Sequence, residues 1–68
     1  MRKDEQLHYI MVEIANGRGG HGDFLRSFAD AMVRADDGNF SILREAAWKL
    51  VDKYGLEKYL QPDEVPRG

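Results

Sequence analysis

The chain has 68 residues, with 10 lysines and arginines against 12 aspartates and glutamates, for a formal net charge of -2. This length allows one small domain, and the slight acidity makes nucleic acid an unlikely partner, because dedicated nucleic-acid binders are usually basic. The absence of cysteine excludes a disulfide framework, a thiolate zinc site and a cysteine nucleophile. Without a long apolar run or a signal-peptide core after Arg2 and Lys3, we expect a soluble cytoplasmic protein that does not enter a membrane.

The first predicted helix covers residues 4–16, with Asp4 as its N-cap and Glu5 in its first turn. Asn16 and Gly17 should end it, because glycine tolerates the left-handed conformation that follows many helices. Apolar residues recur at helical spacing and predict one buried face, formed by Leu7, Ile10, Met11 and Ile14.

The second predicted helix covers residues 23–36. Arg26, Asp30 and Arg34 are four residues apart and predict a charged outer face. The expected core stripe, widened by Leu25, consists of Phe24, Phe28, Ala31, Met32 and Ala35.

The third predicted helix covers about residues 40–54 and should be capped by Asn39 or Asp37. Gly55 stands at a natural C-terminal position, and Leu56 could fold back onto the last turn. The expected core face consists of Phe40, Leu43, Ala47, Leu50, Val51 and Tyr54. Residues 57–60 could add a short helical turn.

These patterns predict an all-α protein: a small three-helix bundle over residues 1–60 with a flexible C-terminal tail over residues 61–68. A chain of this size without disulfides or a metal has a limited core. Burial against another copy would add to that core, so we expect a homo-oligomer.

The connection between the first two helices is unusually rich in glycine. Residues 17–22 contain four glycines and lead into a helix N-terminus, where free backbone N–H groups and the helix dipole favour anions. The sequence therefore suggests a site for a phosphate or a carboxylate, without a cofactor or a metal. Its candidate ligand-binding residues are Arg18, Gly19, Gly20, His21, Gly22, Asp23 and Arg26.

Two alternatives to an anion site remain open for this loop. It could be a structural turn, with Asp23 as N-cap and His21 on the surface or in packing, or it could contact a protein partner. It matches neither a Walker A loop nor a dinucleotide fingerprint. The spacing of His8 and His21 fits no zinc pattern, and His21 has no accompanying nucleophile, so we expect no metal and no enzyme activity.

A second candidate surface lies around Trp48, with Arg44 one turn away and Tyr9 also off the apolar stripes. Tryptophan and arginine are common anchors of protein interfaces. Alternatively, Trp48 could simply cover the edge of the core.

The segment over residues 11–31, which contains the glycine-rich loop, resembles a group of short uncharacterised proteins carried by bacteriophages and prophages. The resemblance extends over most of residues 7–60, and its most specific part is Gly-Gly-His-Gly-Asp-Phe-Leu at residues 19–25. It implies a phage accessory protein, and such proteins often counter bacterial defence.

The resemblance and the loop together lead to a primary hypothesis: a non-enzymatic anti-defence protein that sequesters a phosphate-bearing small molecule, such as a cyclic-nucleotide immune signal. The alternative is an inhibitor that contacts a host defence protein through the helix face around Trp48.

Overall fold

The computed structural model describes residues 3–60 and consists of helices over that range. They are α1 (Asp4–Ala15), η1 (Arg18–Gly20), α2 (Asp23–Arg34), α3 (Asp37–Tyr54) and η2 (Leu56–Tyr59), where η marks a short 3-10 helix. No strand occurs between residues 3 and 60, so the all-α prediction is confirmed there. The predicted tail, residues 61–68, lies outside the described residues.

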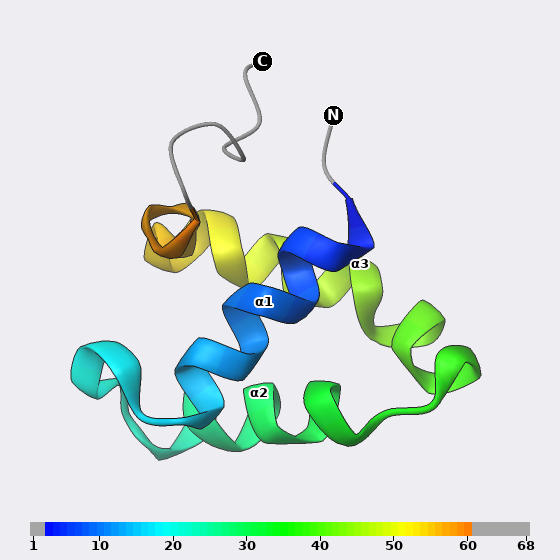
Figure 1. Cartoon of the computed structure of the whole chain (residues 1–68), viewed down its shortest axis with the longest axis horizontal. Helices are drawn as coiled ribbons and strands as arrows, with labels where there is room; N and C mark the ends of the chain where they lie inside the picture. The colour runs from blue at the N-terminus through cyan, green and yellow to red at the C-terminus, as the bar shows by residue number, and fades with distance from the viewer. Residues whose placement is uncertain (1–2, 61–68) are drawn as a thin grey trace.

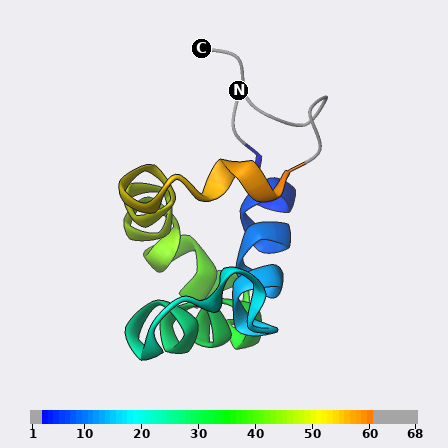
Figure 2. The same cartoon turned by 90° about the vertical axis from the view of Figure 1, so that its left-hand side faces the viewer.

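The helices enclose a common centre. In Figure 1, α1 crosses the molecule between α2 and α3. Figure 2 shows α1, α2 and α3 on successive sides, with η2 running from the end of α3 back to α1. Within residues 3–60 no helix is both long and apolar enough to cross a membrane.

Helix α1 has the predicted buried face. Leu7, Ile10, Met11 and Ile14 are each at most 1% exposed. The N-cap lies one residue earlier than predicted, because Lys3 takes this position and its backbone N–H donates to Gln6 Oε1 at 2.9 Å. The prediction of Asp4 as N-cap is therefore wrong. Asp4 lies instead in the first turn, where its charge still favours the helix dipole.

Helix α2 buries a different face from the predicted core stripe. Leu25, Ala29 and Met32 are buried, whereas Phe24 is 64% exposed, Ala31 is exposed and Phe28 is half-buried. Helix α2 packs mainly on α1, and the small Ala29 lies on the buried face of α2. The prediction of Phe24 and Ala31 as core residues is therefore wrong.

Helix α3 begins earlier than predicted and ends where predicted. Asp36 is its N-cap, and its carboxylate accepts a hydrogen bond from the Asn39 backbone N–H at 2.8 Å. Gly55 ends the helix with φ of 65°, and Leu56 folds back into complete burial, as predicted. Ala47 and Val51 are buried.

The rest of the predicted α3 core face is less completely buried. Phe40, Leu43 and Leu50 are partly buried and pack against the core. Tyr54 is 41% exposed, so the prediction of this residue as part of the core face is wrong.

Candidate functional site

The glycine-rich loop has a backbone that only glycine adopts easily. Gly17, Gly19 and Gly20 have φ values of 93°, 83° and 61°. Side chains are disfavoured at positive φ, because Cβ approaches the following carbonyl oxygen. Gly17, Gly19 and Gly20 are therefore required by the shape of the loop, whether or not it binds a ligand.

The polar side chains of this loop form a cluster with Tyr59. His21 Nε2 lies 2.6 Å from the Tyr59 hydroxyl oxygen, and the two rings meet edge to face. The guanidinium carbon of Arg18 lies 4.8 Å from the centre of the Tyr59 ring, and Arg18 Nη1 pairs with Glu13 Oε1 at 2.6 Å. We call these four residues (Glu13, Arg18, His21 and Tyr59) the Tyr59 cluster.

The Tyr59 cluster changes the interpretation of the loop. Two of the side-chain donors predicted for an anion, Arg18 and His21, already have partners within the fold. Tyr59 is only 6% exposed, and no local pattern in the sequence points to it, because it lies 38 residues after His21.

The start of α2, beside the Tyr59 cluster, holds the other predicted donors. Gly22 is the N-cap, and Asp23 is the first helical residue, so the prediction of Asp23 as N-cap is wrong. No side chain caps this end. Arg26 has no ion-pair partner among residues 3–60, and its side chain reaches towards Gly17. It lines a shallow hollow of about 310 Å³ together with Ala15, Ser27 and Asp30.

The residues predicted for a protein interface lie on two helices, α3 and α1. Trp48 on α3 is half-buried and packs against the core. Arg44 Nη2 pairs with Asp4 Oδ2 at 2.9 Å, which ties α3 to the start of α1. Tyr9, on α1, is 38% exposed.

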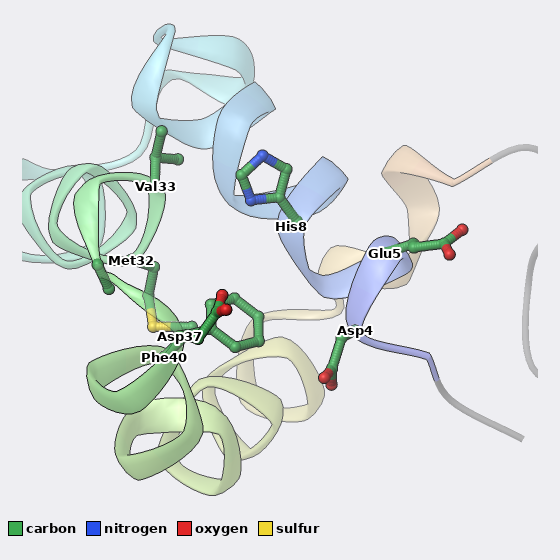
Figure 3. A pocket seen from close by; sticks show the side chains of 8 residues that line it. Asp4, Glu5, His8, Met32, Val33, Asp37 and Phe40 are labelled. Atoms are coloured by element: carbon green, nitrogen blue, oxygen red, sulfur yellow. The ribbon is translucent and has the colours of Figure 1, made fainter.

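A larger pocket, which the sequence did not suggest, lies where α1 begins, α2 ends and α3 begins (Figure 3). It has a volume of about 420 Å³, and we call it the junction pocket. It is lined by Asp4, Glu5, His8, Met32, Val33, Ala35, Asp37 and Phe40.

The junction pocket combines apolar and acidic side chains. Met32 is buried, and Val33 and Phe40 are half-buried, so they provide an apolar lining. Asp4 and Asp37 lie in the first turns of α1 and α3. This combination suits a ligand with an aliphatic part and a positive charge.

The other polar side chains of the junction pocket contribute less to such a site. The Glu5 side chain points away from the apolar residues in Figure 3. Within residues 3–60 no group of three or more histidine and acidic side chains is placed to hold a metal ion. Because Glu5 points away from the apolar lining, Asp4 and Asp37 are the carboxylates on which binding of a positive charge would depend.

No protein-family model matches the chain, and neither a curated protein nor a solved structure matches it. The function is therefore inferred from the geometry of the loop, the junction pocket and the exposed apolar residues.

Proposed function

We propose that this chain is a non-enzymatic binding protein that contacts another protein and holds one of its arginine or lysine side chains in the junction pocket. The observation that supports this proposal is the pocket's apolar lining beside carboxylates at two helix starts. If the chain is a phage accessory protein, as the resemblance implies, the partner would be a protein of bacterial defence.

The proposed contact uses both parts of a basic side chain. Its methylene stem would lie against Met32 and Val33, and its charge would face Asp37 and Asp4. Phe40 adds an aromatic ring, which attracts cations through its π face. Arg44 already neutralises part of the Asp4 charge, so Asp37 carries more of the expected attraction.

The first test is an NMR titration of the isotope-labelled chain with N-acetyl-arginine amide. We expect shifts of the backbone signals of His8, Val33 and Phe40, and we expect Asp37→Asn to weaken the binding about twofold to fivefold, as for an exposed charge pair. N-acetyl-citrulline amide, which has nearly the same shape without the charge, is the control ligand. Equal responses to both ligands, or shifts confined to other surfaces, would contradict the proposal.

A second candidate function is the sequestration of a phosphate-bearing small molecule, which is the hypothesis that the sequence first suggested. The observation that favours it is Arg26, an arginine without an ion-pair partner among the described residues, next to the uncapped start of α2. Arg26 and the free N–H groups of that helix would bind the phosphate. Arg18 and His21 would instead support the loop through the Tyr59 cluster.

This second function is tested by titrating the labelled chain with adenosine monophosphate. Arg26→Gln should abolish the shifts at Asp23 and Phe24, because it removes the charged donor and leaves the Tyr59 cluster intact. Lys49→Gln, on the exposed face of α3, is the control for the loss of one positive charge and should bind as the parent does. If Arg26→Gln responds like the parent, the start of α2 is not the phosphate site.

A further inference from the structure

A stripe of apolar side chains on α2 lies at the edge of the core, which Phe28 contacts. Phe24 is 64% exposed and Ala31 is exposed, whereas Phe28 between them is half-buried. The rings of Phe24 and Phe28 pack on each other with centroids 6.3 Å apart. We call Phe24, Phe28 and Ala31 the α2 stripe.

We propose that the α2 stripe is the contact between two copies of this chain, paired through antiparallel α2 helices about a two-fold axis close to Phe28. In such a pair, residues at nearly equal distances before and after Phe28 lie close to each other. Phe24, four residues before it, lies beside Ala31 of the second copy, three residues after it. A large ring thus meets a small side chain on each side of the axis.

The charges at the two ends of α2 fit the same arrangement. Asp23 precedes Phe28 by five residues and Arg34 follows it by six, so the pairing brings Asp23 of one copy near Arg34 of the other. Asp23 has no ion-pair partner among residues 3–60, and Arg34 pairs only with the exposed Asp30, at 3.1 Å. Opposite charges at the rim fix the antiparallel direction, because a parallel pair would place like charges together.

The size of this face sets the expected strength of the dimer. Helix α2 has 12 residues and is therefore about 18 Å long. A contact of this length is smaller than a standard stable interface, so we expect dissociation constants in the micromolar range. The pairing is independent of what the junction pocket binds.

The test is sedimentation equilibrium of the full chain over a concentration series from about 1 µM to 1 mM, a range that brackets the expected dissociation constant. We expect a monomer–dimer equilibrium, with Phe24→Gln raising the dissociation constant at least tenfold. Ile42→Gln is the matched control, because Ile42 is also a highly exposed apolar residue, 76% exposed, but lies on α3. It should dimerise as the parent does.

A cross-linking experiment checks the geometry without relying on the Phe24 variant. The chain has no cysteine, so Ser27→Cys creates a single thiol, one residue from the proposed axis. The helix axes should lie about 8–10 Å apart, so a short bis-maleimide should join two copies through Ser27→Cys. Lys49→Cys, on the exposed face of α3, should remain uncrosslinked.

Three results would overturn the proposal. The first is a parent chain that is monomeric throughout the series, and the second is a closed assembly of more than two copies. The third is a dimer that Phe24→Gln leaves intact or that cross-links through Lys49→Cys and not through Ser27→Cys.

Discussion

At the scale of single residues, the glycine-rich loop is explained first by its backbone and its contact with Tyr59. Gly19 combines both requirements: its φ is 83°, and a Cβ at this position would collide with the Tyr59 hydroxyl and the His21 ring. Gly20 has a φ of 61°, but open space surrounds it. A substitution at Gly20 therefore tests backbone strain alone, whereas a substitution at Gly19 tests backbone strain together with disruption of the Tyr59 cluster.

We predict that Gly19→Ala lowers the free energy of unfolding by about 2–3 kcal/mol, whereas Gly20→Ala lowers it by about 1 kcal/mol. Both variants place Cβ at a positive φ, but only Gly19→Ala also disrupts the hydrogen bond between His21 and Tyr59. Urea denaturation followed by circular dichroism measures the difference. Equal losses for the two variants would mean that the Tyr59 cluster contributes little to stability.

At the scale of the helices, the sequence predicted the number and order of the long elements better than their faces. The α1 face was predicted correctly, because Leu7, Ile10, Met11 and Ile14 follow the three- and four-residue spacing of one helical face. In α2, the large phenylalanines dominated the predicted stripe, whereas the buried face consists of Leu25, Ala29 and Met32. The start of α3 was missed because Asp36 is both a common turn residue and a good N-cap.

The candidate sites, like the helix faces, could be predicted from local sequence patterns only in part. The glycine positions could be predicted as a tight loop, because left-handed backbone favours glycine at any such turn. The contact of that loop with Tyr59 could not be predicted, because Tyr59 lies 38 residues after His21 in the sequence. The junction pocket joins the ends of three helices, so its acidic and apolar residues share no local spacing that a sequence pattern would reveal.

At the scale of the whole molecule, stability depends on how η2 completes the core. Leu56 is fully buried, and Tyr59 and Leu60 are each 6% exposed. The segment contacts both α3 and α1, and Figure 2 shows it spanning the distance between them. A core of this size provides only about 3–5 kcal/mol, so a single buried leucine represents a large part of it.

We therefore predict that Leu56→Ala removes about 2–5 kcal/mol and with it the cooperative thermal transition. Ile42→Ala is the control and should change the stability by no more than about 0.5 kcal/mol, because Ile42 is 76% exposed. Circular dichroism melts measure both variants.

These melts should be recorded at two protein concentrations, because a dimer through the α2 stripe would add stability that depends on concentration. Leu56 packs within each copy. The stability lost in Leu56→Ala should therefore remain lost at protein concentrations below the dissociation constant of the dimer, where the chain is monomeric. A transition that Leu56→Ala leaves within about 1 kcal/mol of the parent at low concentration would mean that η2 does not complete the core. If Leu56→Ala is less stable than the parent at low concentration but not at high concentration, pairing of two copies compensates for an incomplete core. The stability of this small chain would then depend on its self-association.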